Sequence, residues 1–269
     1  MRILSISSQV AYGPVGNSAA VPAMQAKGHE VLVIPTIMLS NHPGHGPPAG
    51  FRTQGSDLAA ILNKLDALGA LRGVGAAMTG YFASAEQVRA TAQVLSRMKA
   101  AMPKLYILVD PVIGDGDRLY VPLDVAQAIR DELLPVATCI TPNCFELQWL
   151  TGGGISNIAA AVAAARRLGL AEVLATSIPA GPDRLATLAI TANKCAEHFS
   201  ARQRAVPHGT GDFLAGLYLT ERLEHGPESA LGNAMAVLEL AIARSAGSAV
   251  LDVAGTLLAA RRPSKQPSP

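Results

Sequence analysis

One stretch narrows the choice of fold and chemistry more than any other: His208-Gly209-Thr210-Gly211-Asp212-Phe213-Leu214-Ala215-Gly216. Its glycines bracket a hydroxyl residue, and an apolar segment then runs from Phe213 to Leu223. A glycine-rich turn that leads into a helix leaves backbone N–H groups without partners, and these groups point at one spot. Because the positive end of the helix dipole lies there too, the stretch predicts an anion-binding site at the start of a helix.

Asp212 is the unexpected member of this stretch, because a carboxylate in an anion site repels the anion that the site should hold. It fits if the carboxylate faces a second substrate and takes the proton of that substrate's hydroxyl group. Gly-Thr-Gly-Asp at the start of a helix therefore indicates phosphoryl transfer, with Asp212 as the base. The simpler alternative is that Asp212 only caps the helix, as Asp residues often do after a turn.

The composition favours a buried α/β core and argues against nucleic-acid binding. Charged residues make up 16% of the 269 residues and hydrophobic residues 49%, whereas a typical protein has about 25% charged residues. This balance indicates strands buried on both faces and an apolar surface that binds a second subunit. With a net charge of +2 and 4% aromatic residues, no nucleic-acid partner is expected. No apolar run approaches the ~20 residues of a membrane span, so no membrane partner is expected.

The cysteines indicate a reducing compartment. Cys139, Cys144 and Cys195 are odd in number, and no two of them have the spacing of metal ligands. The first residues turn polar at Arg2 and Ser5, too early for a secretory signal. We therefore expect a cytoplasmic protein with reduced thiols.

Short hydrophobic runs alternate with amphipathic segments along the chain. Strands are expected at Arg2–Ser7, Glu30–Pro35, Gly73–Met78, Leu105–Val109, Ala137–Ile140 and Glu172–Thr176. Helices are expected at Asn17–Lys27, Ser56–Leu68, Ser84–Ala101, Leu123–Leu133, Asn143–Leu150, Ser156–Leu168, Asp212–Leu223, Pro227–Ser245 and Val250–Ala260. Leu185–Thr191 and Cys195–Ser200 are expected to pair as a small antiparallel hairpin. The alternation predicts an α/β fold with a mainly parallel central sheet and helices on both faces.

No repeat or linker divides the chain, so residues 1–260 are expected to form one domain. Residues 261–269, rich in Pro and Ser, are expected to form a disordered tail. The segment Ser40–Pro48 contains too many Gly and Pro residues for regular structure, and a long irregular loop inside a compact domain is typical of a lid.

Several predicted strands end in polar residues, namely Ser7-Ser8, Asp110, Thr141-Pro142-Asn143 and Thr176-Ser177. Turns favour such residues for structural reasons, so one polar strand end means little. In open α/β sheets, however, ligands bind outside the carboxyl ends of the strands. Because all these ends are expected at the same edge as the anion loop, together they predict a ligand site.

With these residues assembled, the chain resembles a pyridoxal kinase of the ribokinase-like superfamily over roughly residues 1–225. The resemblance rests on a series of motifs in a particular order and spacing. They are Ser7–Gly13, Gly16–Ala20, Leu39–His42, Thr79–Tyr81, Asp110–Asp115, Thr141–Leu147, Thr176-Ser177 and Gly209–Asp212. No Gly-x-x-x-x-Gly-Lys motif competes for the phosphate role.

The resemblance implies a role for each matching residue. Asp212 is the base, and Gly209, Thr210 and Gly211 form the anion hole beside it. Ser8, His42 of the lid and Tyr81 lie at the pyridoxal ring, together with Asp212. The ATP-binding residues that it implies are Asp110, Asp115, Thr141, Asn143, Glu146, Thr176, Ser177, Gly209 and Gly211. Asp110 and Glu146 lie near the cations, and Asp115 and Asp117 belong to a loop that closes over ATP.

The resemblance also implies Mg²⁺ as the metal, ATP as co-substrate and a homodimer. One branch of the family places Lys where Thr176 stands in this chain. Positive charge near the phosphates must then come from bound cations, which makes Mg²⁺, and K⁺ or Na⁺, more necessary. A second departure is the lid sequence Pro43-Gly44-His45, which leaves open the lid contacts beyond His42.

The expected function is phosphorylation of the 5′-hydroxymethyl group of pyridoxal, and of pyridoxine and pyridoxamine, in vitamin B6 salvage. Two alternatives remain at this point. A hydroxymethylpyrimidine kinase shares the fold, the base and a heteroaromatic hydroxymethyl substrate. A non-catalytic vitamin-B6-binding protein would keep the pocket without the reaction.

Overall fold

The computed structural model describes residues 1–116, 118–203 and 205–261. Its strands are β1 (Arg2–Tyr12), β2 (Glu30–Asn41), β3 (Gly50–Arg52), β4 (Val74–Thr79), β5 (Tyr106–Val109), β6 (Gly114–Asp115), β7 (Arg118–Leu119), β8 (Cys139–Ile140), β9 (Glu172–Pro179), β10 (Arg184–Ile190) and β11 (Cys195–Ala201). Its α-helices are α1 (Asn17–Ala26), α2 (Gly55–Ala67), α3 (Ala85–Ala101), α4 (Leu123–Ala128), α5 (Cys144–Thr151), α6 (Ile158–Arg167), α7 (Thr210–Glu224), α8 (Pro227–Arg244) and α9 (Val253–Ala260).

The central sheet is mixed but mainly parallel, as the sequence predicted. It has nine strands in the order β11-β10-β9-β8-β5-β4-β1-β2-β3. The strands from β9 to β2 in this order pair in parallel, whereas β3 and β10 each run antiparallel to a neighbour. The predicted hairpin is β10–β11, and it extends this sheet. A second hairpin, β6–β7, forms a separate two-stranded sheet that was not predicted.

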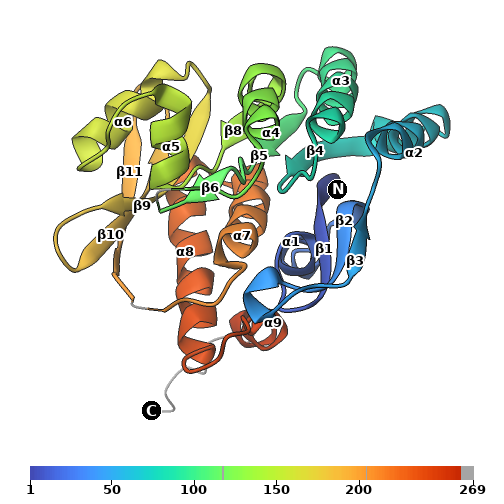
Figure 1. Cartoon of the computed structure of the whole chain (residues 1–269). Helices are drawn as coiled ribbons and strands as arrows, with labels where there is room; N and C mark the ends of the chain where they lie inside the picture. The colour runs from blue at the N-terminus through green and yellow to red at the C-terminus, as the bar shows by residue number, and fades with distance from the viewer. Residues whose placement is uncertain (117, 204, 262–269) are drawn as a thin grey trace, which may run out of the picture.

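Helices cover both faces of the sheet (Figure 1). One hydrophobic cluster joins the sheet to α2–α6 and includes Leu58, Leu95 and Leu147. The other joins the opposite face to α1, α7, α8 and α9 and includes Met24, Tyr218 and Leu238. Both faces of the parallel strands are therefore buried, which explains their nearly continuous apolar sequences.

Strands β1 and β2 are longer than predicted, and this changes the expected lid. Strand β1 continues from Ser7 to Tyr12, and β2 continues past Pro35 to Asn41. The predicted irregular segment was therefore wrong at Ser40 and Asn41, which belong to β2. The chain then forms a 3₁₀ turn at Pro43–His45 and returns as β3 along the edge of β2.

Capping side chains set several helix starts. The hydroxyl of Ser84 accepts a hydrogen bond from the Gln87 N–H at 3.3 Å and so caps α3. Helix α2 begins at Gly55, one residue before the predicted start at Ser56, with Gln54 at its cap position. Helix α5 begins with a capping box formed by Asn143 and Glu146.

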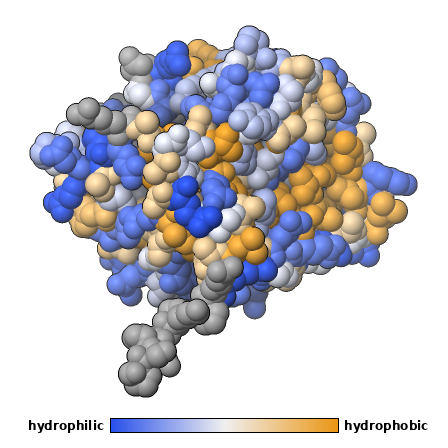
Figure 2. Space-filling model, turned by 90° about the horizontal axis from the view of Figure 1, so that it is seen from below, coloured by the Kyte–Doolittle hydropathy of each residue, from blue (hydrophilic) through white to orange (hydrophobic). Residues whose placement is uncertain are grey.

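The surface is mixed, with one concentration of apolar residues. Hydrophobic residues gather on the right of the view in Figure 2, the side on which β2 and β3 lie in Figure 1. Exposed apolar side chains on these strands include Val33, Met38 and Phe51. Within the described residues, no helix combines the length and apolarity needed to cross a bilayer. Of the expected tail, 262–269 lie outside the described ranges.

Candidate active site

The predicted anion cradle is the start of α7. Gly209 occupies the cap position in the left-handed conformation, with φ 91°, and the helix runs from Thr210. Asp212 is the third helical residue, and no side chain caps this helix end. The alternative in which Asp212 is the cap is therefore wrong. Among the described residues, the N–H groups of Thr210 and Gly211 have no acceptor, so they remain available for an anion, in line with the dipole of the helix.

Gly209 and Gly211 of the cradle differ in how closely other atoms pack against them. A Cβ atom on Gly209 would lie 2.0 Å from the Pro14 carbonyl oxygen, so the cradle is packed tightly against the loop that follows β1. A Cβ atom on Gly211 would meet nothing within 4 Å. Gly209 is thus required by the fold, whereas Gly211 keeps an open space clear above the helix start.

Asp212 is half-buried as a residue, but its carboxyl group is enclosed by protein. A Cβ atom on Gly80 would lie 3.9 Å from Asp212 Oδ1, which places the end of β4 beside this carboxylate. Burial raises the pKa of Asp212 above its ordinary range, while backbone N–H groups of Gly16 and of Asp212 itself lower it in part. This raised pKa makes Asp212 a stronger base than a carboxylate in water.

Asp110 lies at the end of β5, close enough to Asp212 for their charges to interact. Burial, and then the charge of Asp212, raise the pKa of Asp110, and a hydrogen bond from the Thr141 hydroxyl at 2.8 Å opposes the shift. The structure therefore brings Asp110, Thr141 and Asp212 together from three different elements.

Glu146 is buried in the first turn of α5 and is held by backbone N–H groups. Its Oε1 accepts from Ile113 at 2.9 Å and from Gly114 at 3.3 Å, and its Oε2 accepts from Asn143 at 2.9 Å. Burial, and then the charge of Asp110, raise its pKa well above the ordinary range. The Asn143 side chain is used structurally as well, since it caps α5 and donates to the Gly114 carbonyl at 2.8 Å.

The carboxyl groups of Asp110, Glu146 and Asp212 lie close together. No Lys or Arg is among the charged groups that shift their pKa values. Within the described ranges, no cluster of three or more His, Cys, Asp or Glu has the geometry to hold a metal by itself. One oxygen of Asp110 accepts a hydrogen bond from Thr141, and its second oxygen has no hydrogen-bond partner among the described residues, so it could bind a cation. A cation bound here would have to complete its shell with water or ligand oxygens, as Mg²⁺ usually does.

Ser8 lies on β1 where the pairing with β2 is irregular: Ser7 pairs with Pro35, but Gln9 pairs with Met38. The extra residue in β2 forms a bulge opposite Ser8, and bulges often redirect side chains near functional sites. The loop after β1 packs onto Ser8, because a Cβ atom on Gly16 would lie 2.2 Å from Ser8 Oγ. Among the described residues, the Ser8 hydroxyl has no hydrogen-bond partner, so it is free to bind a ligand.

Tyr81 is positioned through its backbone. Its N–H donates to the Ser7 hydroxyl at 3.2 Å, and its carbonyl accepts from the Thr36 hydroxyl at 2.7 Å. The sequence assigned no role to Ser7, which ties the end of β1 to the segment after β4. The glycine that follows β4 was the available signal, because a Cβ atom on Gly80 would lie 2.4 Å from Ser7 Oγ.

His42 lies between β2 and the 3₁₀ turn of the lid. Its ring packs against His208, the residue before the cradle, with 4.1 Å between ring centroids and a tilt of 36°. The structure therefore places the predicted lid histidine against the cradle loop, a contact that the sequence did not indicate.

Thr176 and Ser177 form a second bulge, near the carboxyl end of β9. Ala175 pairs with Leu188 and Ile178 with Ala186, so two residues of β9 lie opposite one of β10. Ser177 is exposed and has φ 57°, the only non-glycine positive φ among the described residues. Such a strained conformation is more frequent at binding sites than elsewhere.

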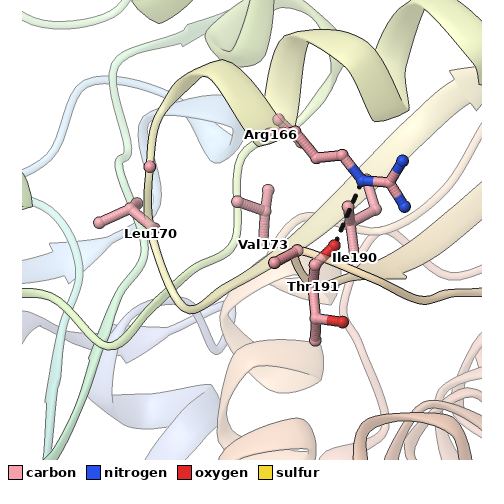
Figure 3. A pocket seen from close by; sticks show the side chains of 8 residues that line it. Arg166, Leu170, Val173, Ile190 and Thr191 are labelled. Atoms are coloured by element: carbon pink, nitrogen blue, oxygen red, sulfur yellow. Dashed lines mark hydrogen bonds between the residues drawn. The ribbon is translucent and has the colours of Figure 1, made fainter.

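Asp115 lies on the β6–β7 hairpin, exposed, with its carboxylate bonded to the Gly116 N–H at 2.7 Å. Asp117, the other acid predicted in this loop, lies outside the described residues. A pocket of about 120 Å³ lies at the opposite edge of the sheet, between Arg166, Val173 and Thr191 (Figure 3). It is separate from the site, because Val173 is at the amino end of β9 and Ser177 near its carboxyl end.

An anion cradle beside an enclosed carboxylate, at the carboxyl edge of such a sheet, defines a phosphotransferase of the ribokinase-like class. A family model described as phosphomethylpyrimidine kinase matches residues 21–252. The chain belongs to the pyridoxal kinase family within this group, as its curated relatives show. A pyridoxine/pyridoxal/pyridoxamine kinase of Bordetella avium is 40% identical over 221 residues, 79% of this chain and 74% of the relative.

Solved structures agree with this assignment. Pyridoxal kinase from Entamoeba histolytica superposes with a TM-score of 0.91 at 26% identity, covering 97% of this chain and 95% of that one. Pyridoxal kinase from Leishmania donovani, in complex with ADP and pyridoxine, superposes with a TM-score of 0.89 at 30% identity, covering 98% and 96%. The predicted fold class and family are therefore confirmed.

Proposed function

We propose that this protein transfers the γ-phosphoryl group of ATP to the 5′-hydroxymethyl group of pyridoxal, pyridoxine and pyridoxamine. The observation that carries the proposal is the position of Asp212, an enclosed carboxylate in the first turn of α7 beside the open space at Gly211. The substrates of the named relatives, and the ADP and pyridoxine in the Leishmania complex, support the choice of reactants. The product from pyridoxal is pyridoxal 5′-phosphate, and pyridoxine and pyridoxamine give their own 5′-phosphates, which places the reaction in vitamin B6 salvage.

In the proposed reaction, the Asp212 carboxylate takes the proton of the substrate hydroxyl as its oxygen bonds to the γ-phosphorus. The bond from that phosphorus to the bridging oxygen breaks, and ADP leaves with the electron pair. The N–H groups of Gly211 and its neighbours are suited to stabilise the charge on the transferred group. Positioning supplies most of the remaining catalysis, because phosphoryl transfer needs little covalent help.

We propose that Asp110 binds Mg²⁺ through its free oxygen and that Glu146 acts on it through water. Both oxygens of Glu146 already accept backbone N–H groups, which favours an indirect role. When bound, Mg²⁺ neutralises phosphate charge. This need is supported by the described residues, since no Lys or Arg is among the groups that shift the pKa of Asp110, Glu146 or Asp212. A monovalent cation, K⁺ or Na⁺, is the proposed source of further positive charge where Thr176 replaces a lysine.

We assign the nucleotide to the edge formed by Thr141, Asn143, Thr176 and Ser177, with Asp115 of the β6–β7 hairpin above it. The bulge and positive φ at Ser177 support this assignment. The vitamin ring is assigned to Ser8 and the lid, with Tyr81 behind it. Ser8 supports this placement because its hydroxyl lies beside Gly16, whose N–H approaches the Asp212 carboxylate.

A parallel assay tests the function directly. ADP release is measured with pyridoxal, pyridoxine, pyridoxamine and hydroxymethylpyrimidine, each with and without Mg²⁺, and the 5′-phosphate of each acceptor is quantified. We expect ADP and the 5′-phosphate of the vitamer supplied to form one for one, only when Mg²⁺ and vitamer are both present. ADP release that is independent of the vitamer, or vitamer binding without turnover, would contradict the proposal.

The second candidate is hydroxymethylpyrimidine kinase activity, which the description of the matching family model favours. It requires the same cradle and base, so the geometry around Asp212 does not distinguish the two. The side of the site assigned to the ring should distinguish the two activities, because Ser8 and the lid are assigned to the heteroaromatic ring, in which the two substrates differ. The pyrimidine arm of the assay therefore decides between them.

We also propose that the protein is a cytoplasmic homodimer. Val33, Met38 and Phe51 support self-association, because they are exposed apolar residues on β2 and β3. Val33 also lines a hollow of about 550 Å³. The free thiols of Cys139, Cys144 and Cys195 support a reducing compartment. Light scattering should show a dimer for the natural chain and a monomer for Phe51→Asp. A monomeric natural chain would contradict the assembly.

A further inference from the structure

The lid and the cradle meet in a group of histidines to which the proposed reaction assigns no proton transfer. This histidine cluster consists of His42 and His45 of the lid and His208 of the cradle loop. The rings of His42 and His208 are partly stacked, at 4.1 Å, and His45 lies edge-on to His42 at 6.3 Å. His45 also lies edge-on to Tyr12 at the end of β1, at 5.2 Å.

The cluster is closely packed, and glycines make the packing possible. A Cβ atom on Gly44 would lie 2.6 Å from His208 Nε2, so the lid backbone lies directly on this ring. A Cβ atom on Gly13 would lie 2.7 Å from His45 Nε2, and φ at Gly13 is +78°. The lid therefore rests on two surfaces, the loop after β1 and the ring of His208.

The lid also has an internal hydrogen-bond frame that fixes the His42 ring. His42 Nδ1 accepts the Gly44 N–H at 3.1 Å, and the His42 N–H donates to the Tyr12 carbonyl at 3.1 Å. Nδ1 is thus unprotonated in this arrangement, and the ring is neutral with its proton on Nε2. Burial, and then His208 and His45, lower the pKa of His42 to about 4, in agreement with a neutral ring.

We infer that His208 is a positioning residue: its ring holds His42, and with it the lid, over the ring-binding side of the site. His208 directly precedes Gly209, which is fixed against Pro14, so the ring stands on a rigid base. The contact connects the element that binds the vitamin with the element that binds phosphate. It rests on the proposed function, since it assigns the lid to the vitamin.

Kinetics of His208→Ala test the inference. Loss of one aromatic pair should raise KM for pyridoxal by about two- to tenfold, while KM for ATP and kcat stay within about twofold of the natural enzyme. His208→Phe keeps a flat ring and should restore KM for pyridoxal. A rise in KM for ATP instead, or no rescue by Phe, would show that His208 does not act through the lid.

A double-variant cycle isolates the contact. If His208 acts only through His42, then His42→Ala and the double variant with His208→Ala should have nearly the same KM for pyridoxal. If the rises in KM for pyridoxal caused by the two single substitutions instead multiplied in the double variant, the inference would be overturned. His198→Ala is the matched control, because this histidine lies on β11 and bonds to Glu239, away from the lid.

Hydrogen exchange separates this inference from the proposed function. Without any substrate, the backbone amides of residues 44–46 should exchange faster in His208→Ala than in the natural chain or in His208→Phe. Unchanged exchange would contradict the inference even if the enzyme phosphorylates pyridoxal. If the amides exchanged faster in His208→Ala but the natural chain did not phosphorylate pyridoxal, the lid contact would be supported and pyridoxal would be excluded as the substrate.

Discussion

Asp212 is subject to two opposite demands on its protonation. It must be ionised to accept a proton, yet its enclosure favours the protonated form and raises its pKa. Asp212→Asn keeps the shape but cannot accept the proton. We expect ATP binding to be unchanged and kcat to fall by about 10²–10⁴-fold, the usual range for a lost general base. Near-natural turnover in the folded variant would remove Asp212 from the mechanism.

The same residue predicts a pH dependence. Below its raised pKa, about 6, Asp212 is protonated and cannot act as a base. The kcat/KM for pyridoxal should therefore fall as the pH drops through this value and level off above it. A profile between about pH 5 and 9, under Mg²⁺ saturation, measures this limb. Full activity retained at the acid end would contradict the assignment.

In the absence of a bound cation, the Asp110 carboxylate should lower the free energy of unfolding. Its pKa is about 7 in the folded protein but about 3.9 when exposed, so its unfavourable contribution grows as the pH rises between these values. At pH above this window and without Mg²⁺, Asp110→Asn should raise Tm, by about 2–4 °C for each kcal/mol recovered.

The advantage of Asp110→Asn should shrink toward acid pH, because the natural carboxyl group is then neutral in the folded protein. Mg²⁺ should stabilise the natural protein more than the variant, and the variant should need more Mg²⁺ for activity. Thermal unfolding with and without Mg²⁺ checks both statements. Equal stabilisation of the two proteins by Mg²⁺ would exclude Asp110 as a ligand.

The start of α7 contains two glycines with different expected roles, Gly209 in folding and Gly211 in function. Gly211→Val fills open space, so it should lower kcat/KM by at least about tenfold while changing Tm little. Gly209→Ala is the matched control: it clashes with Pro14 at a positive φ, and should cost about 1–3 kcal/mol of stability. Thermal unfolding and steady-state turnover of both variants test this contrast. If Gly211→Val lowered Tm but kept its kcat/KM, Gly211 would have a structural role only.

The sequence could predict α7 and its cradle, because the signal is local: glycines, a small hydroxyl residue and an apolar run. It could not predict that β1 continues to Tyr12, because Ser7 and Ser8 resemble a strand end. The bulges opposite Ser8 and at Ser177 depend on register between distant strands, which no local pattern encodes. The contact between His42 and His208 depends on tertiary packing for the same reason.

At the scale of the molecule, parallel pairing assembles the site. Backbone hydrogen bonds connect successive strand ends: Gly80 N–H donates to Ile6, Asp110 N–H to Thr79, and Thr141 N–H to Val109. Because carboxyl ends of parallel strands share one edge, the sequence could predict that these residues meet. It could not predict the strand order, or that Glu146 would be occupied by backbone N–H groups, which points to an indirect metal role.

Substrate discrimination is the sharpest test of whether this edge of the sheet phosphorylates pyridoxal. The measurement is kcat/KM for pyridoxal and for hydroxymethylpyrimidine, with the same enzyme, ATP and Mg²⁺. We predict a ratio of at least about a hundredfold in favour of pyridoxal, or roughly 2.7 kcal/mol of differential transition-state binding. Ser8→Ala should shrink it by about three- to tenfold, the effect of one hydrogen bond. Equal values, or a preference for the pyrimidine, would contradict the account.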